Sequence, residues 1–279
     1  MRACWYNGGV KEALPKKSLG QHWLYDDVTL EAICDAAGVA AVDAVLEVGP
    51  GLGTLTRKLL QRGSNVTAVE FDPNLATSLQ THLSEDSPLK MGDLGRLTVV
   101  EGDILRFNLQ QLPEGYKVVA NIPYYLTSNL IRVLCESPNP FSQAALLIQK
   151  EVAERVCAEP GQLSLLGISA QFYCDVSLGA FVPAALFTPP PKVDSQVLRL
   201  TYRKTPLFAD VDTKAFFRLV RAGFSQKRKT LLNALSAGLS LSKEDTRRLL
   251  DQAGIAPSSR AQALSLDEWH RLYVSSLTV

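Results

Sequence analysis

A glycine-rich turn is the first feature of the sequence with the residue types and spacing to do chemistry. It reads Glu47-Val-Gly-Pro-Gly-Leu-Gly53 and lies between an apolar run, typical of a buried strand, and a helical stretch. Glycines let the backbone turn tightly and approach a ligand more closely than a Cβ atom would allow. The spacing is GxGxG, whereas dinucleotide-binding turns read GxGxxG. We therefore predict that Gly49, Gly51 and Gly53 approach a nucleoside that carries no pyrophosphate.

Two acidic residues follow the next two predicted strands, at the same edge of the sheet. Glu70 lies 21 positions after Gly49, and Asp103 stands in the run GDIL. In nucleotide-binding sheets, an acid about 20 residues beyond the first glycine accepts hydrogen bonds from ribose hydroxyls. The second carboxylate can accept a hydrogen bond from an adenine amino group. The three signals together describe an adenosine without phosphates, so we predict S-adenosylmethionine as the cofactor.

A polar loop follows the fourth predicted strand and reads Asn121-Ile-Pro-Tyr-Tyr125. Asn and Pro both favour turns, but this loop ends at the sheet edge where ligands bind in open α/β folds. An exocyclic adenine amine is a weak nucleophile because its lone pair is delocalised into the ring. The Asn121 amide oxygen and the Ile122 carbonyl can accept its two hydrogens, and the Tyr124 ring can stack on the base. This pattern predicts direct methyl transfer to an adenine amine, without a covalent intermediate.

Six segments carry a resemblance to a known family. In chain order they read GQHWL, EVGPGLGTLT, VEFD, EGDIL, NIPYY and FTPPPKVDSQVLRL. Together with the later run FSQKRKTLLNAL, they resemble the KsgA-type ribosomal RNA adenine dimethyltransferases from about Pro15 to the C-terminus. The resemblance implies an enzyme that dimethylates two adjacent adenosines near the 3′ end of small-subunit ribosomal RNA, within a pre-ribosomal particle.

The resemblance also assigns roles to single residues. Phe187 would face Tyr124 across a flipped base, although anchoring of a proline-rigid loop is the plainer interpretation. Lys192 in the same loop would lie near a phosphate, or is a solvated lysine. His22 stands where many members have Asn, and Ile122 replaces a common Leu. The implied catalytic residues are Asn121, Ile122, Tyr124 and Phe187, and the implied cofactor-binding residues are His22, Leu24, Gly49, Gly51, Gly53, Glu70, Asp103 and Asn121.

Alternating apolar runs and helical stretches indicate the elements that position these residues. We predict an α/β fold of the class I methyltransferase type, with a Rossmann-like, mostly parallel seven-stranded sheet. The last two strands flank a proline-rich loop and predict an antiparallel pair at one sheet edge. The expected strands cover 44–48, 65–71, 97–102, 117–121, 144–149, 172–178 and 196–202.

Strand signals end near Lys204–Pro206, and the remaining C-terminal residues predict a small all-α domain. Its helices are expected at FFRLVRAGF, LLNALSAGL, TRRLLDQAG and DEWHRLYVSSL. The expected divisions are an N-terminal extension at 1–14, a catalytic domain at 15–204 and an RNA-binding domain at 205–279.

Positive charge is concentrated in the predicted helical domain. Residues 204–260 carry eleven bases and five acids, although the whole chain has a net charge of only +1. Within that segment, 214–229 holds six bases and no acid. A charge run is usually a solvated face, but bases unopposed by acids favour phosphate contacts. We predict that Arg221, Lys227, Arg228 and Lys229 bind RNA. Lys16 and Lys17 are expected to extend this positively charged surface.

Composition narrows the class of protein further. Five scattered cysteines and three histidines predict neither a disulfide framework nor a metal site. An apolar run long enough for a membrane span is lacking. The lack of a disulfide framework makes a reducing cytoplasm the expected location, and we expect the enzyme to be a monomer. The nearest rival is an erythromycin-resistance-type methyltransferase of large-subunit RNA. A non-catalytic RNA-binding assembly factor and a dinucleotide-dependent oxidoreductase are the others.

Overall fold

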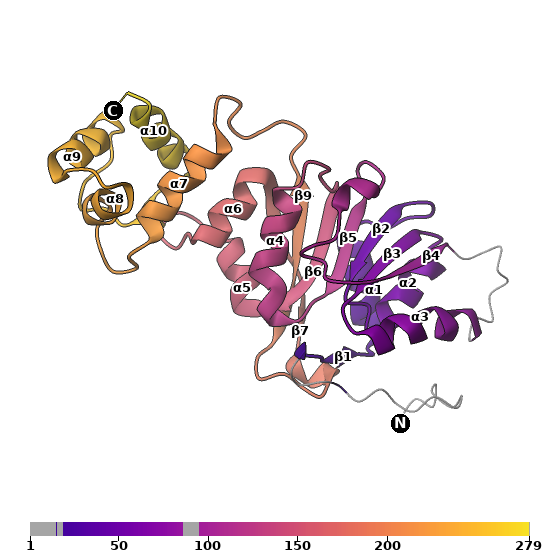
Figure 1. Ribbon diagram of the computed structural model, residues 1–279. Helices are drawn as coiled ribbons and strands as arrows, with labels where there is room; N and C mark the ends of the chain where they lie inside the picture. The colour runs from indigo at the N-terminus through magenta and orange to yellow at the C-terminus, as the bar shows by residue number, and fades with distance from the viewer. Residues whose placement is uncertain (1–14, 16–18, 86–94, 279) are drawn as a thin grey trace.

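A twisted sheet with helices on both faces forms the larger part of the molecule, and a group of helices extends from one end (Figure 1). The computed structural model describes residues 15, 19–85 and 95–278. Seven strands make the sheet, as the sequence predicts. In spatial order they are β4 (Leu97–Glu101), β3 (Asn65–Glu70), β2 (Ala44–Val48), β5 (Lys117–Asn121), β6 (Gln143–Gln149), β9 (Ser195–Tyr202) and β7 (Cys174–Val182).

The first five strands of this order are parallel, and their chain order reverses beside β2. Strand β2 pairs with β3 on one side and with β5 on the other, both in parallel register. Strand β9 runs antiparallel to its neighbours β6 and β7. The predicted antiparallel pair is therefore present, with the later strand inside the sheet and the earlier one at its edge. Ligands bind in such folds outside the carboxyl ends of the strands, where the order reverses.

One strand prediction is wrong at its start. The sequence predicts that Phe172 begins a strand, but it lies in α6 (Leu165–Tyr173), and β7 begins at Cys174. The Ser164 side chain caps this helix by accepting the Gly167 N–H at 3.0 Å. The ring of Phe172 packs edge-on or tilted against rings of the C-terminal helices rather than into the sheet. Tertiary packing therefore decides a segment whose residue types suit either element.

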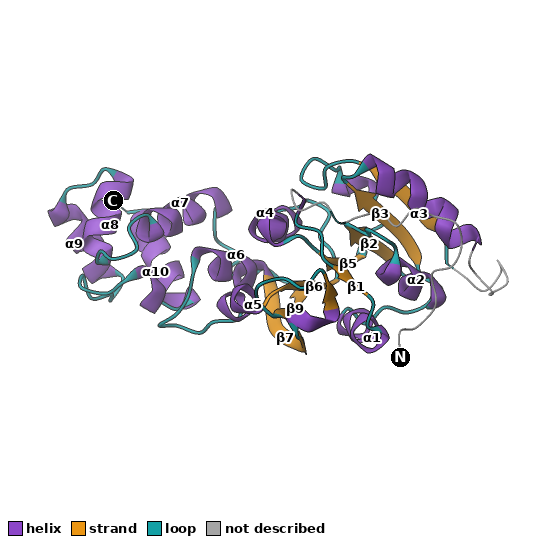
Figure 2. Cartoon of the chain, turned by 90° about the horizontal axis from the view of Figure 1, so that it is seen from below, coloured by secondary structure: helices purple, strands orange, loops and turns teal. Residues whose placement is uncertain are grey.

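Two apolar cores lie on opposite faces of the sheet because adjacent strand residues point to opposite sides. Val118 belongs to one core and Val119 to the other. Helix α4 packs on the first face and α1 on the second, which Figure 2 shows from below. The helices of this part are α1 (Asp27–Ala36), α2 (Thr54–Gln61), α3 (Pro73–Glu85), α4 (Thr127–Cys135), α5 (Lys150–Val156) and α6.

The C-terminal helices share a third core. They are α7 (Thr213–Phe224), α8 (Leu231–Leu239), α9 (Lys243–Gln252) and α10 (Leu266–Ser276), at the four predicted places. The fully buried Trp269 lies in this core, to which Phe172 of α6 also contributes. Because α6 belongs to both packing units, the division after residue 204 stays a prediction. No described helix is long and apolar enough to cross a membrane.

A second, two-stranded sheet was not expected from the sequence. Strand β1 (Trp23–Leu24) pairs antiparallel with β8 (Phe187–Thr188), so that Trp23 lies opposite Thr188. Strands of two residues are too short for a periodic pattern to reveal. This ladder holds the start of the described chain against the proline-rich loop before β9.

Candidate active site

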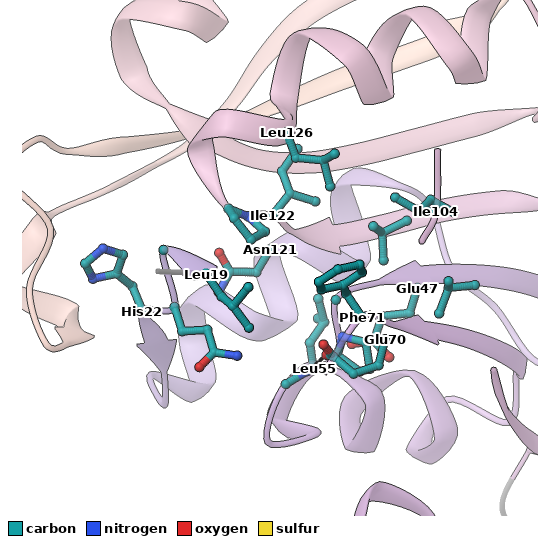
Figure 3. Close-up of a pocket in the computed structure, with 18 of the residues that line it drawn as sticks. Leu19, His22, Glu47, Leu55, Glu70, Phe71, Ile104, Asn121, Ile122 and Leu126 are labelled. Carbon is teal, nitrogen blue, oxygen red and sulfur yellow. Dashed lines mark hydrogen bonds between the residues drawn. The ribbon is translucent and has the colours of Figure 1, made fainter. Parts of the chain in front are cut away.

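The pocket at the carboxyl ends of β2, β3, β4 and β5 has a volume of about 260 Å³. Side chains from distant parts of the chain converge on it, as Figure 3 shows. Most of the residues singled out from the sequence are brought together here. The predicted residues that line it are His22, Leu24, Gly49, Gly51, Glu70, Asp103, Asn121, Ile122, Tyr124 and Phe187.

The glycine turn after β2 has left-handed backbone at each predicted glycine. The φ angles are +66° at Gly49, +57° at Gly51 and +78° at Gly53. A Cβ atom added to Gly49 would meet nothing within 4 Å, whereas one on Gly51 would lie 2.6 Å from the Trp23 ring. A Cβ on Gly53 would lie 2.6 Å from Leu79, behind the pocket wall. Gly49 thus leaves room for a ligand, and the other two allow close packing.

The two predicted acids keep acceptor capacity toward the pocket. The buried Glu70 accepts the Gly51 N–H with Oε2 at 3.1 Å and the Asp72 N–H with Oε1 at 2.9 Å. Asp103 is half-buried, and its Oδ1 accepts the Leu105 N–H at 2.9 Å. Because a carboxylate has about four lone-pair sites, each acid can still accept from a ligand hydroxyl or amine.

Glu47 is a pocket residue to which the sequence analysis assigned no role. It is 1% exposed, and neither carboxylate oxygen has a hydrogen-bond partner among the described residues. Burial raises the pKa of Glu47 to about 8; the nearby Thr56, whose hydroxyl also has no hydrogen-bond partner in the described part of the chain, opposes this rise, and the charge of Glu70 adds to it. An unsatisfied buried acceptor is unfavourable, so a ligand donor entering here would be stabilised. The feature of the sequence that could have pointed to Glu47 is an acidic residue inside the otherwise apolar run AVLEV.

The polar loop after β5 presents its groups to the same pocket. Asn121 ends the strand, and the Ile122 backbone follows with its side chain buried. Tyr124 opens the short 3₁₀ helix Tyr124–Leu126, and its hydroxyl lies 3.0 Å from the Ser195 hydroxyl. Burial raises the pKa of Tyr124, so the phenol is protonated at neutral pH. The ring is therefore held in a fixed orientation at the pocket wall.

Two aromatic residues next to the β1–β8 ladder line the pocket and differ in exposure. His22 is half-buried; its Nδ1 lies 2.6 Å from the Pro189 carbonyl oxygen, and its ring lies 6.2 Å from that of Tyr124. Phe187 of β8 lines the pocket but is only 4% exposed and belongs to the same apolar core as α1.

The predicted RNA-binding residues lie apart from the pocket wall. Arg221 is exposed on α7, and Lys227, Arg228 and Lys229 are exposed in the turn after this helix. Lys192 is exposed in the loop after β8. Lys16 and Lys17 are outside the described residues.

The pocket fits an adenosine that carries an amino-acid tail. Gly49 offers open space, Glu70 and Asp103 offer acceptors, and the buried acid group of Glu47, without a hydrogen-bond partner among the described residues, can pair with a ligand N–H group. S-Adenosylmethionine has these features, with its ribose, adenine amine and ammonium group. Within the described ranges, no cluster of three or more His, Cys, Asp or Glu side chains is placed to hold a metal ion.

The strand order and this pocket define a class I S-adenosylmethionine-dependent methyltransferase. Residues 13–276 match the family described as ribosomal RNA adenine dimethylase. The chain belongs to this family, which confirms the resemblance, the enzyme class and the cofactor inferred from the sequence, and makes RNA its partner.

Similar proteins cover almost the whole chain. Ribosomal RNA small subunit methyltransferase A of Dehalococcoides mccartyi is 40% identical over 262 residues, covering 92% of this chain and 87% of the relative. A dimethyladenosine transferase from Plasmodium falciparum is 26% identical with a TM-score of 0.76, covering 92% and 98% of the two chains. The 23S rRNA methyltransferase ErmE is 29% identical with a TM-score of 0.70, covering 91% and 98%.

Replacing Glu70 with Ala should weaken S-adenosylmethionine binding by about 1–3 kcal/mol, because polar groups are left unpaired. Glu101→Ala is the matched control, since Glu101 lies opposite Glu70 in the β3–β4 register but is exposed. Isothermal titration calorimetry measures both affinities. Unchanged binding by folded Glu70→Ala protein would remove this carboxylate from the cofactor site.

Glu47 should make the stability of the cofactor-free protein depend on pH. The folded protein holds the Glu47 proton more tightly than the unfolded chain does, because the pKa rises from 4.5 to about 8 on folding. Stability should therefore fall as pH rises through this window, by up to about 1.4 kcal/mol per pH unit. Urea unfolding at several pH values measures the slope. Glu47→Gln should flatten it, and an equal slope in both proteins would contradict the assignment.

Proposed function

We propose that this enzyme transfers methyl groups to the exocyclic amines of two adjacent adenosines near the 3′ end of small-subunit ribosomal RNA, giving N6-dimethyladenosines. The observation that carries the proposal is the polar loop after β5, whose acceptors border the same pocket as the glycine turn. The small-subunit substrate is supported by the name of the relative at 40% identity. Family membership supports dimethylation of adenine.

The chain's own groups orient the amine for attack. Bound S-adenosylmethionine supplies a methyl group attached to a positively charged sulfur. The Asn121 amide oxygen and the Ile122 carbonyl accept the two amine hydrogens, which directs the nitrogen lone pair toward that methyl group. Transfer of that methyl group would form the N–C bond while the S–C bond breaks and leaves its electron pair on sulfur, and the amine would then release one proton to water. Catalysis by this route rests on positioning and on acceptors aimed at the developing positive charge.

The base reaches the pocket by leaving its stack, which favours a loop where unstacking is easy. Tyr124 supplies a stacking face, and the sequence-based proposal places Phe187 across from it. The exposed bases of α7 and the following turn would contact phosphates of the surrounding RNA. We further propose that the substrate is a pre-ribosomal particle, that the enzyme acts as a monomer, and that it works in the cytoplasm, where bacterial ribosomes are assembled.

Methylation of large-subunit RNA is the second candidate function, because ErmE shares the fold over 91% of this chain. Tritiated S-adenosylmethionine should be incubated with unmethylated small and large subunits, and the label mapped by nuclease digestion. Label in two adjacent small-subunit adenosines is the expected result. Label in large-subunit RNA would establish the alternative, and cofactor binding without transfer to either subunit would indicate a non-catalytic factor.

Asn121 and Tyr124 should differ in what they contribute. Asn121→Ala should lower the methylation rate at saturating cofactor while RNA binding stays nearly intact, because phosphate contacts dominate affinity. Tyr124→Ala should lose about 1–3 kcal/mol of base stacking. Tyr124→Phe should keep most activity, with a modest loss from the Ser195 hydroxyl that it leaves unpaired. Equal inactivity of the Phe and Ala variants in single-turnover assays would show that the phenol, not the ring face, is required.

The basic turn should control RNA affinity and its dependence on salt. Neutralising Lys227, Arg228 and Lys229 together should weaken RNA binding and flatten the plot of log affinity against log salt, because fewer counterions are released. The control removes the same charge from Lys243, Arg247 and Arg248 on α9, where Arg248 already faces Glu244 at 3.5 Å. Filter binding over a range of salt concentrations measures both slopes. Equal slopes in the two triple variants would show that the bases of the turn are solvated and do not contact RNA phosphates.

A further inference from the structure

Ser195 is a fully buried serine whose hydroxyl contacts the pocket wall from behind. It begins β9, where it lies in register with Gln149 of β6 on one side and with Val182 of β7 on the other. Its Oγ atom lies 3.0 Å from the phenolic oxygen of Tyr124. Tyr124 lines the pocket, and Ser195 is not among the described residues that do so. Ser195 can therefore act on a bound base only through Tyr124.

The backbone that carries this hydroxyl is fixed by hydrogen bonds of the preceding residue. The Asp194 carbonyl accepts the Lys150 N–H at 3.0 Å, and Asp194 Oδ1 accepts the Ala184 N–H at 2.9 Å. The neighbouring strands then hold Ser195 inside the sheet. A serine on a fixed backbone can place its hydroxyl in only a few staggered positions. The antiparallel part of the sheet therefore decides where the Tyr124 hydroxyl finds its partner.

The Tyr124 phenol needs a partner because it is half-buried and keeps its proton. Burial raises the pKa of Tyr124, the Ser195 hydrogen bond opposes this rise, and the charge of Asp194 adds to it. A buried O–H group without a partner is unfavourable, so a phenol deprived of Ser195 would turn toward another acceptor. The acceptors closest to it in the chain are the Asn121 amide and the Ile122 carbonyl, whose residues line the same pocket. In the proposed reaction these two acceptors belong to the adenine amine.

We infer that Ser195 is a positioning residue for methyl transfer: by pairing with the Tyr124 hydroxyl, it fixes the stacking ring and keeps the phenol away from the acceptors of the amine. This inference rests on the proposed adenine methylation and deepens it. Tyr124 keeps the stacking role proposed above. Because Ser195 directly follows the proline-rich loop, the same residue also links that loop to the pocket wall.

Two single variants and their combination test whether Ser195 acts through the phenol. Ser195→Ala leaves the phenol without its partner, and the kcat for methylation of unmethylated small subunits should fall by about 5-fold or more, the lower range for leaving one buried group unpaired. Tyr124→Phe keeps the ring face and most activity. The double variant Ser195→Ala/Tyr124→Phe has neither hydroxyl, and replacing both partners by apolar groups is nearly neutral, so its kcat should lie within about 2-fold of that of Tyr124→Phe. Removing the phenol should thus rescue Ser195→Ala.

Ser64→Ala is the matched control. Ser64 is also a fully buried serine, and its hydroxyl donates to the Leu59 carbonyl at 2.7 Å. It precedes the amino end of β3, whereas the pocket lies at the carboxyl end, so Ser64→Ala should leave kcat unchanged. Calorimetry with S-adenosylmethionine should give the same affinity for all of these proteins, which also confirms that they fold.

A second readout needs no RNA. Urea unfolding of wild type, Ser195→Ala, Tyr124→Phe and the double variant gives four unfolding equilibrium constants. The increase in the double variant should be smaller than the product of the two single increases, because the hydrogen bond that each substitution removes is the same one.

The outcomes distinguish this inference from the proposed function. A wild-type kcat in Ser195→Ala would overturn the inference, and so would loss of cofactor affinity in this variant. An equal fall of kcat when Ser195→Ala is added to Tyr124→Phe would overturn it as well, even with non-additive unfolding, since β9 would then act independently of the phenol. Label in large-subunit RNA alone would contradict the proposed substrate, and the same comparison of rates on that RNA would still decide the role of Ser195.

Discussion

The hydrogen bond from the Gly51 amide to the buried carboxylate of Glu70 links the two loops on which the rest of the site depends. Its donor lies in the turn after β2, and its acceptor ends the neighbouring strand β3. The second Glu70 oxygen holds the Asp72 amide, so one side chain sets the start of the loop before α3 as well. Such a bond to a charged acceptor is among the stronger ones. Glycine is needed at position 51 because the backbone there is left-handed and an added Cβ atom would lie 2.6 Å from the Trp23 ring.

The two halves of the pocket are built by different means. The half proposed to hold the cofactor consists of parallel strand ends, with Glu47 on β2, Glu70 on β3 and Asp103 in the loop that directly follows β4. The acceptor half is assembled from the loop after β5, the β1–β8 ladder and the strand that carries Ser195. Its rings are therefore positioned by hydrogen bonds between segments far apart in the chain.

The exposed basic residues and the pocket lie in different packing units, because the molecule has three apolar cores. The exposed bases near α7 are carried by helices packed around Trp269, while the pocket lies between the two cores of the sheet. Helix α6 contributes Phe172 to the third core and also packs beside β7. In the function proposed above, substitutions that alter RNA affinity and substitutions that alter methyl transfer therefore fall in different parts of the molecule.

Local residue patterns determined the parallel strands, the glycine turn, the acids at the strand ends and the four C-terminal helices. Each of these is encoded within a few neighbouring residues by apolar periodicity or by the glycine spacing. Tertiary structure alone decided that Phe172 is helical, that Glu47 is a buried carboxylate without a partner, and that His22 lies beside Tyr124. The physical reason is that these three outcomes depend on contacts between distant segments, whose free energies no local pattern contains.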